Sequence, residues 1–276
     1  MDSIRQNKKM LFGGMGFFGG VAGAILSELT SPGEHGESVL ALIGGVGIWG
    51  AVFAAGILVG LTWALEIYAG RKGLSGVKLR GAVVSGLVAG AIAGGGAQAV
   101  FMAHNFTGLA RFFFQSGCWG IAGIILGWRL SRSIPNLGGG RAALAGLIGG
   151  WIGGMGFLIV SSLFAEVVGR ALGIGILGAA LGLAMVIVEE LCREASLEVI
   201  WAPKEITTLS LGTRSISIGG GDDHVYIRGL PQRSATLQLE EGRIQYTDTA
   251  TGKKTEFRDG SRIKIGKIEM VVHAQK

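Results

Sequence analysis

The pattern of hydrophobic and polar positions changes once along the chain, close to residue 192. Before that point, long apolar runs alternate with short polar loops. Each run has about the 20 residues that an α-helix needs to cross the hydrocarbon core of a bilayer. The pattern predicts six membrane-spanning helices, at Met10–Leu29, Leu40–Tyr68, Gly81–Met102, Phe112–Trp128, Ala142–Phe164 and Ala171–Val188.

After residue 192 the apolar positions alternate with polar ones, which is typical of strands with one buried face. Nine short segments carry this pattern or are rich in β-branched residues, with turn residues between them, and this spacing predicts a small β-sandwich. The segments are 196–202, 207–211, 215–219, 224–229, 234–242, 243–248, 254–257, 261–266 and 267–273. We therefore expect a transmembrane domain over residues 1–192 and a β-rich domain over residues 193–276.

Positive charges in the short loops predict how the helices are oriented. They gather before the first span, between the second and third, and between the fourth and fifth: Arg5, Lys8, Lys9, Arg71, Lys72, Lys78, Arg80, Arg129, Arg132 and Arg141. The alternate loops hold Glu34, His35 and Glu37, then His104 and Arg111, then Glu166 and Arg170. By the positive-inside rule, both termini and the β-rich domain lie in the cytoplasm. The net charge of +6 thus reflects topology, and we expect no nucleic-acid binding.

Small residues at a spacing of four recur in all six predicted spans, and they indicate three helical hairpins, at about 9–70, 78–132 and 141–190. This spacing places them on one helix face, where they let helix backbones approach closely. The predicted packing glycines are Gly16, Gly20, Gly56, Gly60, Gly86, Gly90, Gly94, Gly123, Gly127, Gly146, Gly150, Gly154, Gly178 and Gly182. The simpler interpretation is that they hold the six helices together. The alternative is that some face a neighbouring subunit in a homo- or hetero-oligomer, or line a pore.

The sequence does not place charged, polar, histidine or cysteine residues at the spacing that catalysis, metal binding or coupled transport requires. Glu28, Glu66, Glu189 and Glu190 fall near helix ends, where a charge reaches the bilayer surface easily. Gln98 is the polar residue well inside a span. The histidines and the two cysteines lack the spacing of a metal or catalytic site. We expect a protein that is not an enzyme, with no cofactor and no metal, in contact with membrane lipid.

Three stretches of the β-rich domain share a resemblance to one family. They are ISIGGGDDHVYI, LPQRSATLQLEEGRIQYTD and FRDGSRIKIGKIEMVV. Residues 193–276 resemble a forkhead-associated (FHA) domain, with its glycine turn after an apolar strand and its closing Asp-Gly stretch. The resemblance implies an all-β sandwich whose loops bind a partner protein.

Members of this family usually bind phosphothreonine through an Arg, a Ser, a His and an Asn. The aligned positions hold Gly220, Pro231, Ser234 and Thr251, which lack or weaken those donors. Arg228 and Arg233 flank the same loop and offer substitute positive charge, or are simply solvated surface. We expect the loops to dock a cytosolic protein without phosphothreonine. The predicted partner-binding residues are Gly219, Gly220, Arg228, Arg233, Ser234 and Thr251.

Two functions are compatible with these features. The first is a membrane-embedded scaffold or regulatory subunit, which packs into an assembly through its glycine-rich helices and holds a cytosolic protein through the FHA-like domain. The second is a channel or permease formed by the glycine-rich helices, gated or localised by that domain. The small number of polar residues within the spans favours the first.

Overall fold

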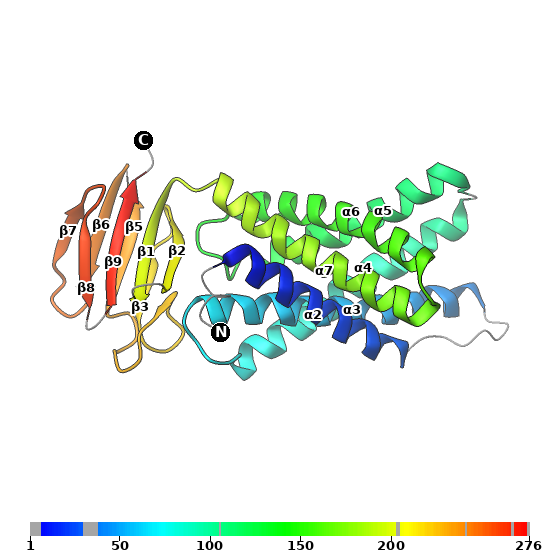
Figure 1. Ribbon diagram of the computed structural model, residues 1–276, viewed down its shortest axis with the longest axis horizontal. Helices are drawn as coiled ribbons and strands as arrows, with labels where there is room; N and C mark the ends of the chain where they lie inside the picture. Colours follow the sequence, from blue (N-terminus) through cyan, green and yellow to red (C-terminus); the bar gives the residue numbers. More distant parts are fainter. Residues whose placement is uncertain are drawn as a thin grey trace.

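Six long helices form an elongated bundle, and a β-sandwich lies at one end of it (Figure 1). This computed structural model describes residues 7–29, 38–104, 106–202, 205–240, 242–265 and 268–274. The helices are α2 (Lys8–Glu28), α3 (Val39–Tyr68), α4 (Gly76–Ala103), α5 (Gly108–Leu130), α6 (Gly139–Leu163) and α7 (Glu166–Leu191). All six are long and apolar enough to cross a membrane, which confirms the prediction of six such helices. Arg5, Glu34, His35 and Glu37 lie outside the described residues.

Several helices begin before the apolar run that predicted them, because polar residues cap their first turns. The side chain of Ser75 accepts a hydrogen bond from the backbone N–H of Lys78 (3.4 Å), and α4 therefore starts at Gly76. Asn7 caps α2 in the same way through Met10 (3.1 Å). The apolar run marks the part of a helix suited to lipid, and the cap marks where the helix begins.

Around the bundle the helices pack in the order α4, α3, α2, α7, α6, α5. Successive pairs share extensive contacts, but α4 and α5 meet over a much smaller area. The first and third predicted hairpins are therefore closely packed pairs, while the middle hairpin, 78–132, is not. The reason lies in its glycines, because those of α4 face α3 and those of α5 face α6.

All fourteen predicted packing glycines lie at contacts within the chain. A Cβ added to any of them would come within 3.0 Å of another helix, so each permits an approach that alanine would prevent. Gly16 of α2 lies against Gly178 of α7, and Gly123 of α5 lies against Gly146 of α6. The stripes thus bring helices of the same chain together. Each of these fourteen glycines lies against another helix of the chain, so none of them is free to contact a neighbouring subunit.

The remaining chain forms a sandwich of two sheets. Its strands are β1 (Ala195–Ala202), β2 (Glu205–Leu211), β3 (Ile216–Gly219), β4 (Val225–Tyr226), β5 (Ala235–Glu240), β6 (Arg243–Asp248), β7 (Lys254–Phe257), β8 (Arg262–Ile265) and β9 (Ile268–Ala274). One sheet has the order β2-β1-β9-β8 and the other β4-β3-β5-β6-β7. Alternate residues such as Leu197, Ile218, Leu237 and Val272 are fully buried between the sheets. Every predicted segment overlaps a strand, so the sandwich prediction is confirmed.

The largest difference in the strands concerns the segment 224–229. The structure has only the two-residue strand β4 there, because the chain turns back after Tyr226. The N–H of Ile227 donates to the carbonyl of Gly219 (2.8 Å), and Gly229 has a positive φ of 91°. The residues that follow β4 therefore form a loop beside the turn at Gly219.

Candidate functional site: the junction of bundle and sandwich

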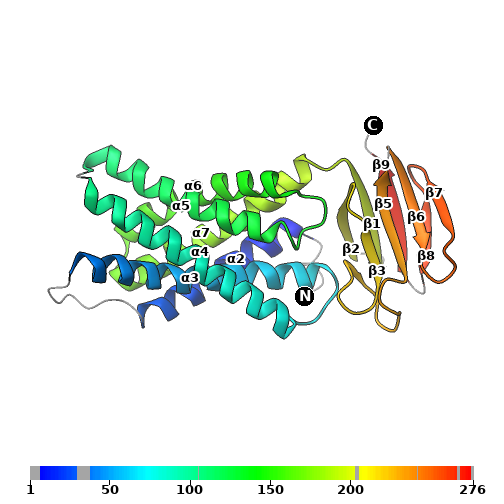
Figure 2. The ribbon, with the colours of Figure 1, turned by 180° about the vertical axis from the view of Figure 1, so that it is seen from behind.

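The sandwich meets the bundle edge-on. Strand β2, an outer strand of one sheet, lies toward the helices, while β7 and β8 lie farthest from them (Figures 1 and 2). Strand β4, an outer strand of the other sheet, also contacts the bundle, through Tyr226 and Ala69. An outer strand presents N–H and C=O groups that no neighbouring strand satisfies, and proteins commonly cover such edges. Here the loops at the ends of the helices provide the cover.

Tyr68, the last residue of α3, hydrogen-bonds to backbone groups in the middle of β2. Its hydroxyl donates to the carbonyl of Thr208 (2.9 Å) and accepts the N–H of the same residue (2.7 Å). The side chain of Asn136, in the loop between α5 and α6, donates to the carbonyls of Ser210 (2.9 Å) and Arg214 (3.1 Å). It also accepts the N–H of Arg214 (2.9 Å). The end of α3 and the α5–α6 loop thus extend the hydrogen bonding of the sheet.

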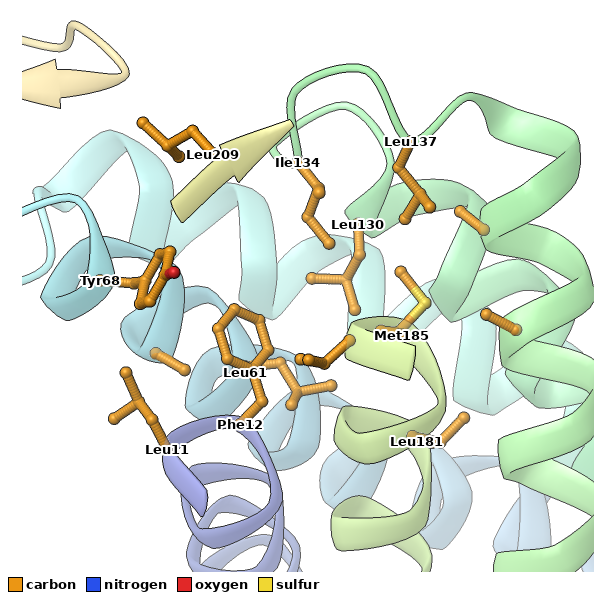
Figure 3. Packing of buried hydrophobic residues seen from close by; sticks show 14 of the residues in the cluster. Leu11, Phe12, Leu61, Tyr68, Leu130, Ile134, Leu137, Leu181, Met185 and Leu209 are labelled. Carbon is orange, nitrogen blue, oxygen red and sulfur yellow. The ribbon is translucent and has the colours of Figure 1, made fainter. Parts of the chain in front are cut away.

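The β4 edge is held in the same manner, since the N–H of Tyr226 donates to the carbonyl of Ala69, directly after α3 (3.2 Å). Apolar side chains fill the space between these polar contacts. Figure 3 shows Leu209 of β2 above the helix ends, with Ile134 and Tyr68 facing the same region. The buried hydrophobic residues of bundle and sandwich form one continuous cluster. The junction is therefore a packed interface rather than a flexible tether.

A buried ion cluster lies at one side of the junction. The carboxylate of Glu189 in α7, whose side chain is 3% exposed, contacts the Nζ of Lys8 (2.7 Å) and the guanidinium of Arg193 (3.2 Å). The hydroxyl of Ser210 on β2 donates to the same carboxylate and accepts from Arg193 (3.1 Å). One carboxylate therefore joins the first helix, the last helix and the sandwich.

A second buried cluster lies at the turn between α3 and α4. Glu66 accepts two hydrogen bonds from Arg71 (both 3.2 Å) and one from Lys78 (2.8 Å). The rest of the Arg71 guanidinium donates to the carbonyls of Gly221 (3.3 Å) and Asp223 in the β3–β4 loop. Lys78 also pairs with Asp222 of that loop (3.2 Å). Arg71 of the turn and Lys78 of α4 thus link the bundle to the β3–β4 loop, which the sequence predicted to bind a partner.

The predicted binding residues Gly219 and Gly220 are buried in this loop. A Cβ on Gly220 would come within 3.0 Å of the carbonyl oxygen of Leu230, and its N–H donates to the carbonyl of Pro231 (2.9 Å). An arginine side chain does not fit at position 220, because the β4–β5 loop packs directly against it.

The other predicted binding residues lie at the same end of the sheet but do not converge on a common point with free donors. The hydroxyl of Ser234 donates to Pro231 (2.8 Å), within its own loop. Arg233 has a positive φ of 54°, and its N–H donates to the carboxylate of Asp223 (2.6 Å), while its side chain is exposed. Arg228 is exposed, and Thr251 is exposed in the β6–β7 turn, where its N–H donates to Asp248 (3.1 Å).

The electrostatics of the β3–β4 loop are opposite to those of a phosphate site. The loop presents carbonyl oxygens of Gly221 and Asp223 and the carboxylate of Asp222 to the two cations of the bundle. Beside them, burial lowers the pKa of His224, whose Nδ1 accepts the N–H of Ser217 (3.1 Å). A loop with this arrangement binds cationic groups, and within this chain it holds Arg71 and Lys78.

A polar cavity of about 480 Å³ lies beside the Glu189 cluster, between the ends of α6 and α7 and strand β2. Four of its charged lining residues pair within the chain, Arg141 with Glu194 (3.6 Å) and Arg193 with Glu189, while Arg214 also lines it. Among the described residues, no group of three or more His, Cys, Asp or Glu side chains is arranged to hold a metal ion.

Sequence reasoning missed the residues that build the junction, above all Tyr68, Arg71, Asn136 and Asp223. It interpreted Arg71 and Lys78 as topology signals and Glu66 and Glu189 as charges that reach the bilayer surface. The structure buries both glutamates instead, at 5% and 3% exposure. The available signal was a glutamate in the last turn of a helix, followed by an arginine four or five residues later, as in Glu66/Arg71 and Glu189/Arg193.

No protein-family model matches the chain, and comparison with curated proteins and with solved structures also gives no match.

Proposed function

We propose that the protein is a multi-pass membrane scaffold or regulatory subunit that holds a cytosolic protein in a fixed orientation at the membrane surface. The observation that carries this proposal is the junction. Two buried ion clusters, an apolar contact and the hydrogen bonds along both edge strands join the sandwich to the bundle. A domain bound in this way keeps a fixed orientation relative to the bundle, and so does any protein bound to it. A flexibly tethered recognition domain would need none of these contacts.

Charge supports the cytoplasmic placement of the sandwich. Lys8, Arg71, Lys78 and Arg141 all lie at the end of the bundle that carries the sandwich, where each of them forms an ion pair. The opposite end holds the Arg170 pair with Glu28 (2.7 Å) and Glu166. Under the positive-inside rule, the sandwich end faces the cytoplasm.

The sandwich is, in this proposal, an FHA-like domain that no longer binds phosphothreonine. The two-sheet architecture agrees with the resemblance, and position 220, where the family carries its arginine, is packed against Leu230. The loop that would contact phosphate is bound to Arg71 and Lys78 of the same chain. A phosphothreonine peptide therefore finds no donor set at this loop, whose oxygens face the cations of the bundle.

Besides the exposed loop residues Arg228, Arg233 and Thr251, the edge remote from the bundle is open to a partner. The outer strands there carry exposed charged pairs, Arg243 with Glu256 (3.5 Å) and Arg262 with Glu269 (2.9 Å). Charges on outer strands prevent indiscriminate strand pairing and leave polar recognition possible. We expect the cytosolic partner to bind this edge through polar contacts.

Affinity capture from the native membrane tests the proposal. The intact chain and a variant with Arg243→Glu and Arg262→Glu, which reverse exposed charges at the remote edge, are compared for the proteins they retain. Loss of a defined cytosolic partner from the variant, with the fold unchanged by circular dichroism, supports the proposal. Retention of the same partner by the variant contradicts the assigned surface. Solute or ion flux through proteoliposomes of the purified protein would favour a channel or permease instead.

A further inference from the structure

An apolar cavity of about 160 Å³ lies in the half of the bundle away from the sandwich. It is lined from five helices, α3 to α7, with no charged side chain. Phe53, Trp119 and Phe157 form its inner wall, with ring centroids 5.3 and 5.2 Å apart in that order. Gln98 of α4 and Gln115 of α5 contribute the only carboxamide side chains of the lining. An apolar cavity of this size in a protein excludes water and binds apolar molecules.

The cavity lies where the ring of helices is weakest. Lining residues from α4 and α5 face each other across it, and these two helices share the smallest contact of any neighbouring pair. Of the six helices, α4 is also the least buried, with 17% of its apolar window covered. Beside the cavity, Ile92 of α4 and Ile121 of α5 are 61% and 57% exposed on the outer surface. If the bundle spans a bilayer, an opening between these helices would face its hydrocarbon.

Gln98 lies at a depth that suits the polar part of a lipid, and Gln115 lies deeper. Helix α4 has 28 residues and measures ~42 Å at 1.5 Å per residue, so it extends ~6 Å beyond each side of a ~30 Å hydrocarbon core. Gln98 lies five residues before the end of the helix, or ~8 Å along its axis, close to the boundary of the core. Helix α5 has 23 residues and measures ~34 Å, so it extends only ~2 Å beyond each side of the core. Gln115 lies seven residues, or ~10 Å, from the start of α5 and therefore ~8 Å inside the core.

We propose that the cavity binds a segment of one acyl chain of a membrane lipid, which enters between α4 and α5 from the leaflet opposite the sandwich. The amide N–H group of Gln98 donates to an ester carbonyl of the lipid, and the chain runs inward past Gln115 against Phe53, Trp119 and Phe157. The medium around the opening is hydrocarbon and the lining is uncharged, so a lipid chain matches the cavity better than an ion or a polar solute does. This inference rests on the membrane insertion proposed above.

Photo-cross-linking of the intact chain in nanodiscs tests the proposal. The probe is phosphatidylcholine with a diazirine midway along one acyl chain, and cross-linked residues are mapped by mass spectrometry. We expect cross-links at Phe53 and Trp119, inside the cavity, as well as at the outward-facing Ile92 and Ile121. Cross-links confined to Ile92 and Ile121 would overturn the proposal while leaving membrane insertion intact. Absence of cross-links at all four would contradict insertion itself.

Two variants of α4 sharpen the test. Ala97→Phe places a ring in the cavity, because Ala97 lines it, whereas Ala91→Phe places the same ring on the exposed face of the helix. We expect Ala97→Phe to reduce cross-linking at Phe53 and Trp119 at least tenfold and Ala91→Phe to leave it unchanged. Equal cross-linking in both variants would overturn the assignment. The wild-type pattern decides the question alone if Ala97→Phe does not fold.

Discussion

Glu189 is the residue whose loss should loosen the sandwich most. Its carboxylate is 3% exposed and contacts Lys8 and Arg193, whose side chains are 12% and 17% exposed. Glu189→Gln leaves two buried cations without a counter-charge, and breaking a buried pair from one side costs about 3–5 kcal/mol. The adjacent Glu190 provides a matched control, since it pairs with Lys9 in the open, at 35% and 51% exposure. Glu190→Gln should cost no more than about 1 kcal/mol.

Hydrogen exchange of the Thr208 amide measures this difference locally, because that N–H donates to Tyr68 across the junction and is released when the junction opens. A loss of about 3 kcal/mol accelerates exchange by about two orders of magnitude, since each 1.4 kcal/mol is a factor of ten. Glu190→Gln should change it about fivefold at most. Equal acceleration in both variants, or none in Glu189→Gln, would refute the reasoning that burial makes the Glu189 cluster strong.

Three further predictions concern the junction, the bundle and the sandwich. Tyr68→Phe removes the hydroxyl that satisfies both backbone groups of Thr208 and should destabilise the junction by about 1–3 kcal/mol. Exchange of the Arg214 amide, which donates to Asn136 across the same junction, measures this loss, and unchanged exchange there would contradict the role assigned to the hydroxyl. Gly123→Ala inserts a methyl group against Gly146 and should lower the free energy of unfolding in detergent by about 1–3 kcal/mol. Gly117→Ala on the same helix, where an added Cβ has no atom within 4 Å, should be neutral or stabilising. The reverse ranking would contradict the packing assigned to the stripe. Burial lowers the pKa of His224, so the unfolded chain binds the proton more tightly, and the stability of the sandwich should fall as pH drops through the unfolded value of 6.5. His224→Gln should flatten this part of the profile, as followed by chemical unfolding at a series of pH values.

Apolar runs and strand periodicity predicted the elements well, because both follow from local burial. Each of the six spans and nine strand segments overlaps a helix or strand of the expected kind. The ends were less predictable, since Ser75 and Asn7 set them through capping rather than through hydrophobicity. The glycine spacing identified packing faces correctly, but it did not show that Gly86 and Gly90 would turn α4 toward α3 rather than α5.

The candidate site was less accessible to prediction, because it depends on contacts between residues far apart in the chain. Nothing local to Tyr68 indicates that its hydroxyl meets Thr208, 140 residues later. The predicted binding loop lies at one end of the sheet, and its neighbours in the bundle, which the sequence did not reveal, determine what it contacts. The carbonyls of Gly221 and Asp223 face Arg71 of the bundle, so the loop holds cations of its own chain.

The central claim is that the sandwich is fixed relative to the bundle, and a distance measurement tests it most directly. Spin labels are attached at Lys72→Cys, in the exposed turn after α3, and at Lys254→Cys, on exposed β7, with Cys118 and Cys192 replaced by alanine. In nanodiscs, pulsed electron paramagnetic resonance should give one narrow distance distribution, which broadens when Glu189→Gln is added. A broad distribution in the protein without Glu189→Gln would contradict a fixed junction.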